Sequence, residues 1–501
     1  MSTRVMARAI AFALLVVPAL LVGQSVSDTV GFTDRDRQVY ATSLRYVVND
    51  TLRGTHAVWK DGFGDIRYNF CPRDSTWRWP DGTVINEYPR NLGCLDVDIT
   101  NGAAVVSTDF LTRGVAQTAY LEDTLPGQAG FVERYTGAGF RHNLISTTNY
   151  GWPKFLASRN DTVFFSSGFS YRRLDLVGPF PAYSLASSKK TGRFGCIWAA
   201  TDGPRAGRLF LQETPNNGQS WYPVVPLSDS LRSRTTLNRN LLGAAAYYDS
   251  IRLYLVAGFH DGSNPSRSEL WLYSKYDSPP WYPVHRFELP ETVRVGDNAL
   301  AAGRPTIAFN PRSAELYVAW EQFDPDNIEP LTGLARADVW AARSTDRGRT
   351  WGEPVRLTAP DQSSKRFPFL AEVACDTLEL LYFADQVAGF WEQGQGPPTR
   401  NPVIRLRFPA SGLPASGIAQ QPVPFVPSCR VVPAASRHGF EVITPSPVEV
   451  RVVDVTGRCL ARLRVPAGRT GIPANLPPGL YLVRLQPRNG PAATARFIRL
   501  P

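Results

Sequence analysis

The residue types that most often carry out catalysis fall into no recognisable catalytic spacing in this 501-residue sequence. Its five histidines include no His-x-x-x-His pair of the kind that holds zinc on a helix. The segment Ser167-Gly168-Phe169-Ser170 lacks the spacing of a Gly-x-Ser-x-Gly nucleophile elbow, and the sequence has no glycine-rich loop that would cradle phosphates. These patterns predict no catalytic residue, no cofactor and no metal centre.

One acidic segment has the oxygen-rich composition of a calcium site. Asp324-Pro325-Asp326-Asn327, followed by Glu329, offers carboxylate and amide oxygens, which are the ligands that Ca²⁺ prefers. The same residues are typical of a solvated loop between strands, and we favour that interpretation.

The composition predicts that short strands and turns would position any functional residues. The chain has 42 Pro and 40 Gly, together with 12 Trp, 19 Tyr and 26 Phe. Hydrophobic residues make up 43% and charged residues 20%, which is enough for a packed core. No long stretch has a helical apolar period, so an all-β fold is expected.

The N-terminus has the three parts of a secretory signal peptide. Arg4 and Arg8 precede an apolar run of 14 residues from Ala9 to Val22, and Gly23-Gln24-Ser25 offers small residues for cleavage. A run this short is typical of a signal peptide, because a membrane span needs about 20 residues. We predict a signal peptide at residues 1–24, a secreted or cell-surface location, and no transmembrane segment in the mature protein.

The six cysteines are compatible with disulfides in an exported protein. Cys71 and Cys94 lie in adjacent strand regions and are a candidate pair, as are Cys429 and Cys459. The spacing matches no zinc pattern, and six cysteines allow fifteen connectivities.

The net charge of +10 is concentrated at the two ends of the chain. From residue 429 onward, eleven arginines face only Glu441, Glu449 and Asp454, so this segment carries +8. A basic tail on an exported protein indicates contact with a surface or envelope, and we expect no nucleic-acid partner.

A repeated turn motif is the most informative signal. Residues 344–351 read Ser-x-Asp-x-Gly-x-x-Trp, residues 214–221 repeat the pattern with Thr and Asn in the first two places, and residues 274–281 keep only its ends. The tryptophans are 60 and then 70 residues apart, which suits one four-stranded repeat with its loops. The residues that carry the motif are Thr214, Asn216, Gly218, Trp221, Ser274, Trp281, Ser344, Asp346, Gly348 and Trp351.

This motif resembles the Asp-box (BNR repeat) of sialidase-like β-propellers, which is a structural turn and not a catalytic element. Six pairs of apolar segments accompany the boxes, so the resemblance implies a six-bladed propeller over residues 29–408. The unit from Gly151 to about Leu227 is long and has an additional strand-like segment, Phe194–Ala200. We interpret it as an insertion in blade three, with a seventh blade as the alternative.

The same resemblance raises the question of a sialidase active site. Sialidases hold the substrate carboxylate with three arginines and use a Tyr–Glu pair and an Asp. Arg45, Arg304 and Arg366 lie at starts of apolar strands, and Glu372 follows. With 48 arginines in the chain such placements are expected by chance, and no Tyr–Glu pair can be assigned. Aromatic residues that could instead stack on sugar rings are Trp59, Trp152, Trp198, Trp320 and Trp391.

The C-terminal segment has its own strand pattern. A Pro-rich linker at residues 409–428 precedes a small β-rich domain at 429–501. This domain resembles the C-terminal sorting domain (type A) of type IX secretion system cargo and the related FlgD-like immunoglobulin-type domains, which implies an Ig-like β-sandwich and contact with the export machinery. The matching residues are Asp454, Gly457, Arg458, Leu476, Gly479 and Tyr481.

Together these observations predict a secreted, non-enzymatic propeller that binds a glycan or another surface ligand. The alternative is a secreted glycoside hydrolase of sialidase type.

Overall fold

The computed structural model divides the chain into two compact units, Met1–Ile418 and Ala419–Pro501. It describes residues 25–416 and 430–500 apart from positions 39–43, 92, 150–151, 168–169, 179–181, 201–202, 232–233, 236, 238–243, 261–264, 433–434, 437–438, 445–446, 455–457, 474–475 and 488–492. The predicted signal peptide and Gly457 therefore lie outside the described residues. No helix in the described part is long and apolar enough to cross a membrane.

Seven four-stranded antiparallel sheets make up the described part of the first unit. Six of them are formed by consecutive strands: β2 (Val47–Asp50), β3 (Gly54–Lys60), β4 (Ile66–Pro72), β5 (Thr83–Val84); β6 (Cys94–Val97), β7 (Ala104–Thr112), β8 (Val115–Asp123), β9 (Phe131–Ala138); β10 (Arg141–Ser146), β11 (Lys154–Arg159), β12 (Thr162–Ser166), β13 (Tyr171–Leu176); β14 (Ala182–Ser187), β15 (Phe194–Ala199), β16 (Leu209–Thr214), β17 (Val225–Pro226); β18 (Ala244–Asp249), β19 (Arg252–His260), β20 (Arg267–Ser274), β21 (Trp281–Glu288); and β22 (Ala302–Asn310), β23 (Glu315–Ile328), β24 (Ala335–Ser344), β25 (Val355–Arg356).

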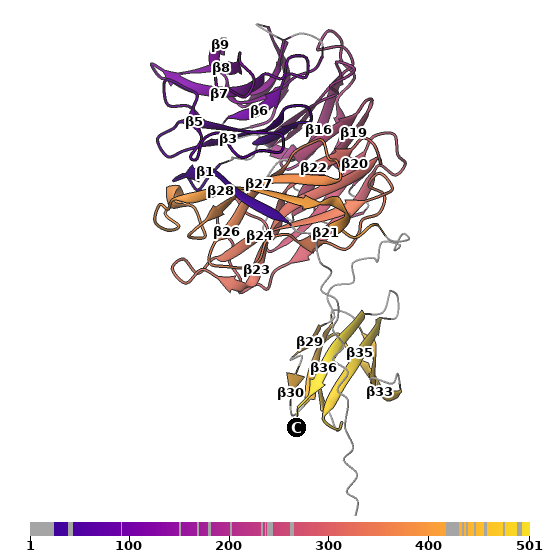
Figure 1. Ribbon diagram of the computed structural model, residues 1–501. Helices are drawn as coiled ribbons and strands as arrows, with labels where there is room; N and C mark the ends of the chain where they lie inside the picture. Colours follow the sequence, from indigo (N-terminus) through magenta and orange to yellow (C-terminus); the bar gives the residue numbers. More distant parts are fainter. Residues whose placement is uncertain are drawn as a thin grey trace, which may run out of the picture. The chain divides into compact units, whose positions relative to one another are not determined.

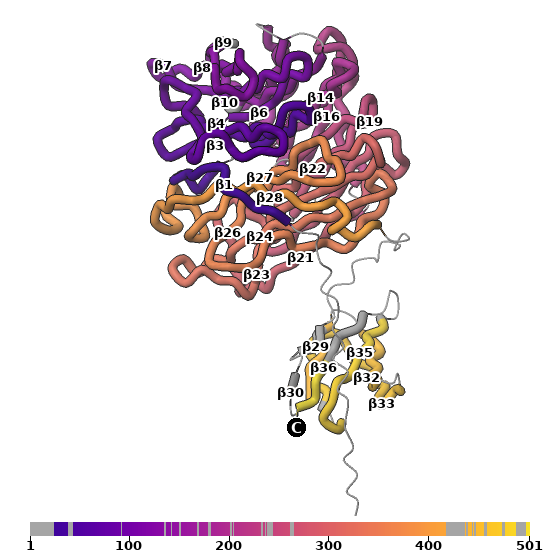
Figure 2. The backbone as a smooth tube through the Cα atoms, in the orientation of Figure 1, coloured from indigo at the N-terminus to yellow at the C-terminus, as the bar shows by residue number. Residues whose placement is uncertain are grey.

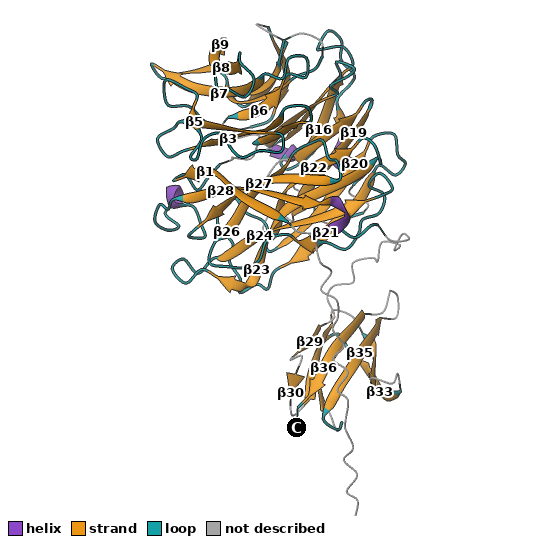
Figure 3. Cartoon of the chain, viewed as in Figure 1, coloured by secondary structure: helices purple, strands orange, loops and turns teal. Residues whose placement is uncertain are grey.

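The seventh sheet joins the two ends of this unit. Its strands are β26 (Ser364–Leu370), β27 (Thr377–Asp385), β28 (Asn401–Pro409) and, at the outer edge, the N-terminal β1 (Val26–Thr33). In Figure 1 the indigo β1 lies beside the orange β28. The helical segments described here are four short 3₁₀ turns: η1 (Gly203–Arg205), η2 (Leu227–Ser230), η3 (Trp391–Gln393) and η4 (Ala410–Gly412), and strands dominate Figure 3.

The first strands of successive sheets contact one another in order around a ring. β2 lies against β6, β6 against β10, and so on through β14, β18 and β22 to β26, and β2 also contacts β27 of the seventh sheet. Figure 2 follows the chain around this ring from indigo to orange. The unit is therefore a β-propeller, and the all-β prediction is confirmed.

The sheets number seven, so the expected count of six blades is one short and the alternative count agrees with the structure. The long unit from residue 151 is not a blade with an insertion, because β14–β17 form a separate sheet. The first strands of these two sheets read Arg-His-Asn-Leu-Ile-Ser and Ala-Tyr-Ser-Leu-Ala-Ser. Such small and polar residues near the propeller axis give no clear apolar period.

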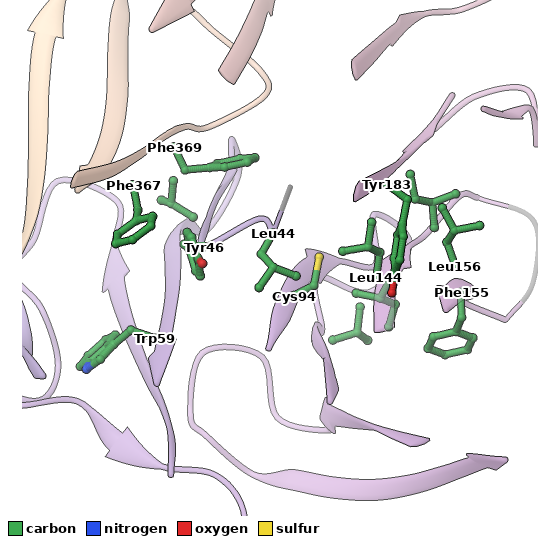
Figure 4. Close-up of a cluster of buried hydrophobic side chains, with 14 of the residues drawn as sticks. Leu44, Tyr46, Trp59, Cys94, Leu144, Phe155, Leu156, Tyr183, Phe367 and Phe369 are labelled. Carbon is green, nitrogen blue, oxygen red and sulfur yellow. The ribbon is translucent and has the colours of Figure 1, made fainter. Parts of the chain in front are cut away.

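The blades pack face to face, so their central strands have no solvent side. Eight of the nine residues of β19 are buried, which explains its near-continuous apolar sequence. Tyr46 packs edge-on against Phe369 and Phe383, with ring centroids 6.4 and 5.6 Å apart, and so joins the first and seventh blades. Figure 4 shows Tyr46 and Phe369 within the largest buried cluster.

The second unit has two sheets. One contains β29 (Arg430–Val432), β31 (Gly439–Thr444) and β34 (Gly468–Pro473). The other has the order β30 (Ala435–Ser436), β36 (Ala493–Arg499), β35 (Gly479–Pro487), β32 (Val448–Asp454), β33 (Cys459–Val465). Phe440 and Phe497 meet in their common core, with ring centroids 4.8 Å apart. This is the small β-sandwich that the sequence predicts.

Candidate functional site

The axis of the propeller is filled by side chains from all seven blades. The apolar or small residues around it include Cys94, Leu144, Ser184, Ala245, Ile307 and Phe369. The remaining space is about 20 Å³, which holds about one water molecule. The axial channel is therefore too small to hold a sugar.

Arg45 borders this channel and is fully engaged by neighbouring groups. Its Nε donates to Glu372 Oε1 at 2.8 Å, and its Nη1 donates to the carbonyl oxygens of Leu95 and Ile145. Asp96 lies 3.5 Å from Nη1 and also accepts a 2.5 Å bond from Lys189. Burial opposes the charge on Asp96, but Lys189 and Arg45 hold the pKa of its carboxyl below the ordinary value.

Arg304 and Arg366 form a second network around one buried carboxylate. Arg366 Nε donates to Glu321 Oε2 at 3.1 Å, and Arg304 Nε lies 3.3 Å from Glu321 Oε1. Both guanidinium groups also lie over the ring of Phe367, at 4.9 and 5.1 Å from its centroid. Burial raises the pKa of the Glu321 carboxyl, but Arg366 and Arg304 outweigh it and lower that pKa.

A repeated backbone irregularity positions these two arginines. β22 and β26 each carry a register shift next to the arginine, and Arg304 and Phe367 have φ values of 49° and 52°. A bulge of this kind redirects the side chains of a strand, and left-handed φ is costly for such residues. Arg304 and Arg366 thus share Glu321, whereas Arg45 pairs with Glu372 and Asp96. All three arginines are buried, so they form no open clamp.

Tyrosines near carboxylates are also buried. Tyr248 Oη donates to Glu213 Oε1 at 2.7 Å, but both side chains are inaccessible. Burial, and then Glu213, raises the pKa of Tyr248 well above its ordinary value. Tyr46 is likewise buried, and its hydroxyl donates to the carbonyl of Gln38 at 2.5 Å. Neither hydroxyl is placed to attack a substrate.

Two buried aspartates, Asp36 and Asp385, belong to no motif that can be recognised in the sequence. Asp36 follows β1 and Asp385 ends β27, and each has one buried carboxylate oxygen without a hydrogen bond. Burial and, to a smaller extent, Glu392 raise the pKa of Asp36 to about 6, although the hydrogen bond from the backbone N–H of Trp391 lowers it. Burial and then Asp36 raise the pKa of Asp385 to about 7. The two side chains are distant in sequence, which is why no local motif contains them.

An open groove of about 310 Å³ is lined by residues of the first and seventh blades. We call it the Phe63 groove, and it is lined by Phe32, Thr33, Asp34, Asp61, Phe63, Arg67, Asp81 and Arg400. The side chain of Phe63, in the turn between β3 and β4, is 78% exposed. An apolar ring left in water next to convergent polar groups is a common feature of ligand sites.

The polar groups of this groove are held in place by neighbouring groups. Arg67 Nε donates to Asp61 Oδ2 at 2.8 Å, and Asp61 Oδ1 accepts the backbone N–H of Phe63 at 3.0 Å. Arg400 lies over the ring of Phe32, 4.2 Å from its centroid, and 3.5 Å from Asp81 Oδ1. Carboxylate and guanidinium groups next to an exposed ring can bind hydroxyl groups and an apolar face at once.

The box motifs lie at turns between the third and fourth strands of their blades. In the box at 344–351, Ser344 Oγ accepts the N–H of Gly348 at 2.7 Å, and Asp346 Oδ1 accepts the N–H of Thr350 at 2.9 Å. The box at 214–221 repeats this pattern with Thr214 accepting from Gly218 and Asn216 accepting from Ser220, both at 2.8 Å. In the third, Ser274 and Trp281 flank a differently built turn, in which Arg252 pairs with Asp277 at 2.7 Å.

The tryptophans outside the box motifs differ in their exposure. Trp59, Trp198 and Trp320 are core residues, whereas Trp152 is 67% exposed. Residues 324–327 lie within β23, so the expectation of a loop between strands is wrong, and Asp324 pairs with Arg356 at 2.7 Å. No group of three potential metal ligands occurs among the described residues.

The described cysteines, Cys71, Cys94, Cys196, Cys375 and Cys459, are free thiols. The suggested Cys71–Cys94 pair does not form, since Cys94 borders the axis and Cys71 Sγ donates to the carbonyl of Ser75. Cys429 lies outside the described residues.

In the second unit, described motif residues make two local hydrogen bonds. Asp454 Oδ1 accepts the N–H of Arg458 at 3.0 Å. Tyr481 Oη donates to the carbonyl of Pro477 at 2.6 Å, in the segment that links Leu476 to Gly479 at the start of β35.

No family model matches the chain, and no curated protein matches it. Among solved structures it is similar to the BP39L lectin from Burkholderia pseudomallei (12% identity, 72% of this chain and 99% of the lectin, TM-score 0.42). It is also similar to the GH93 α-L-arabinofuranosidase of Fusarium graminearum (11%, 63% and 92%, TM-score 0.37) and the intramolecular trans-sialidase from Ruminococcus gnavus (12%, 75% and 98%, TM-score 0.35). At these TM-scores the similarities establish neither the fold nor a function, and the propeller is identified from its sheets alone.

Proposed function

We propose that this protein is a secreted or cell-surface binding protein whose propeller holds a neutral glycan in the Phe63 groove. The observation that carries the proposal is the exposed Phe63 ring beside carboxylate and guanidinium groups in a groove of about 310 Å³. Sugar rings have an apolar face that packs on aromatic rings and hydroxyl groups that bond to Asp and Arg. The volume is at the lower end of the range for small-molecule sites.

The charges of the groove favour a neutral ligand. Three aspartates and two arginines line it, so it has a formal charge of −1, which disfavours an acidic sugar. The buried arginines do not offer an alternative site for a carboxylate. Arg45 is paired with Glu372 and Asp96. Arg304 and Arg366 share the single carboxylate of Glu321, and all three arginines are buried, so a carboxylate ligand cannot reach them.

The route to the cell exterior is part of the same proposal. The signal peptide at 1–24 would direct export, with the propeller at 29–408, the linker at 409–428 and the domain at 429–501 as the parts of the chain. The C-terminal domain would engage the export machinery through the turns around Asp454 and Tyr481. The Asp-box residues would act as structural turns, in line with their internal hydrogen bonds.

A glycan array followed by calorimetric titration tests the binding function. The mature chain should bind one or more neutral glycans, and Phe63→Ala should weaken that binding at least tenfold, the equivalent of about 1.4 kcal/mol. Tyr88→Ala is the matched control, because Tyr88 is 63% exposed but lies outside the groove. The proposal fails if no glycan binds, or if both variants behave alike.

A second function, glycoside hydrolysis, is favoured by one specific observation. Burial raises the pKa values of Asp36 and Asp385 to about 6 and 7, so each carboxyl group can hold a proton near neutral pH as an acid catalyst must, although both side chains are buried. Hydrolysis of a panel of fluorogenic glycosides, including a sialoside, distinguishes the two functions. Turnover that is abolished in Asp385→Asn would establish the hydrolase, whereas no turnover on any substrate supports binding.

A further inference from the structure

The five-stranded sheet of the second unit presents a row of arginines on its outer face. Arg451 of β32 is directly opposite Arg462 of β33 on one side and Arg484 of β35 on the other. The neighbours Val450, Val452 and Val483 are buried, so the arginines alternate with the core residues and point outward. Like charges directly opposite each other destabilise a sheet.

This positive row is only partly neutralised within the protein. Glu449 contacts Arg451 at 2.6 Å and Arg462 at 2.9 Å, and it is opposite Arg464 in the register. Within the described part of the chain, Arg464 and Arg484 make no ion pair. The sheet therefore carries a surplus of exposed positive charge on one face, which a separate anionic partner would stabilise.

The same face carries exposed apolar side chains next to the row. Leu482 precedes Arg484 by two residues on β35 and is opposite Val453, and Leu480 is opposite Ile498 of β36. Leu480, Leu482 and Ile498 are all exposed. A nucleic-acid backbone would satisfy the arginines but would leave these side chains in water.

We infer that this face binds an anionic lipid surface. The arginine row would contact the lipid phosphates, while Leu480, Leu482 and Ile498 insert among the acyl chains beside them. The positive charge of the row and the exposed apolar side chains beside it together favour an anionic lipid surface over a nucleic acid. The inference concerns the second unit alone and does not depend on the proposed glycan site.

Co-sedimentation of the full mature chain with lipid vesicles tests the inference. We expect binding to vesicles of phosphatidylcholine with phosphatidylglycerol and none to phosphatidylcholine alone. Arg484→Gln should weaken binding about fivefold, the effect of one basic residue at a membrane surface. Arg469→Gln is the matched control, because Arg469 lies on β34 of the other sheet and its substitution removes the same single positive charge.

Leu482→Gln provides a second, charge-neutral variant and should also weaken binding. Far-UV circular dichroism should show that each variant is folded. Equal loss in Arg484→Gln and Arg469→Gln would mean that only net charge matters and would overturn the inference. Binding to duplex DNA without binding to anionic vesicles would overturn it as well.

Discussion

At the scale of single residues, the molecule neutralises its buried charges in two different ways. Glu321 and Asp96 are paired with arginine or lysine, and their pKa values are lowered despite burial. Asp36 and Asp385 instead have raised pKa values, so each holds a proton up to a higher pH than an exposed aspartate. These carboxyl groups make the stability of the propeller depend on pH.

Asp385→Asn should remove part of that dependence. The folded pKa of about 7 is above the ordinary 3.8, so the contribution of Asp385 is fully present below about pH 4 and is lost as pH rises through 7. The variant should match wild type near pH 4 and be more stable at pH 8, by a few kcal/mol at most. Urea unfolding at both pH values measures this.

Asp74→Asn is the control, since the Asp74 side chain is 92% exposed, and it should change stability at neither pH. If Asp385→Asn were less stable than wild type at pH 8, the assigned protonation would be wrong.

The sequence predicts that Arg45, Arg304 and Arg366 lie at the starts of strands, but it does not predict their ion-pair partners. Glu321 lies on β23, whereas Arg366 lies on β26 of the next blade. Asp96 lies on β6, whereas Arg45 precedes β2 of the first blade. Contacts between blades depend on the blade count and on bulges, which local periodicity does not encode.

At the scale of elements, the box turns depend on a glycine whose place no other residue can take. Gly348 has φ 87°, and a Cβ there would lie 2.0 Å from Leu272 Cδ2. Both the backbone conformation and the packing against the neighbouring blade therefore oppose a side chain. The motif pattern predicted the turn, whereas this contact became visible only in the structure.

Gly348→Ala should destabilise the propeller by about 2–4 kcal/mol, because it adds overpacking to backbone strain. Gly333→Ala separates the two causes, since Gly333 has φ 69° but no atom within 4 Å of the added Cβ. It should cost about 1 kcal/mol. Equilibrium denaturation of both variants gives the comparison, and equal losses would show that packing against Leu272 is unimportant.

At the scale of the whole propeller, the ring is closed by a strand from the start of the chain. β1 pairs with β28 from Val26–Arg407 to Thr33–Asn401, and Arg405 Nε donates to Asp28 at 3.0 Å. Val30 of the same strand is fully buried in the main core cluster. The last blade is thus built from the two ends of this unit, which are distant in sequence.

Val30→Asp should weaken this closure, because it buries an unpaired carboxylate, and should lower stability by about 3 kcal/mol or more. Val26→Asp is the matched control on the same strand, where the side chain is 49% exposed, and should have little effect. Calorimetric melting temperatures of the two variants measure the difference. A similar melting temperature for both would mean that β1 is not needed to close the ring.

The repeat pattern also shows what could be predicted at this scale. Four-stranded repeats and a separate C-terminal β domain follow from strand-like segments, turns and a Pro-rich stretch. The blade count does not, because β10 and β14 are short and rich in small or polar residues. The Phe63 groove was not predicted either, since its residues come from β1, the turns around β4 and the segment before β28.

The central claim is that the propeller binds its ligand in the Phe63 groove and not at its buried charges. A crystal structure of the mature chain with the tightest neutral glycan from the array tests this most directly. We predict a sugar ring packed on Phe63, with hydroxyl groups bonded to Asp81 or Arg400. A sugar held instead by Asp36 and Asp385, or by Arg304, would contradict the account and favour the hydrolase.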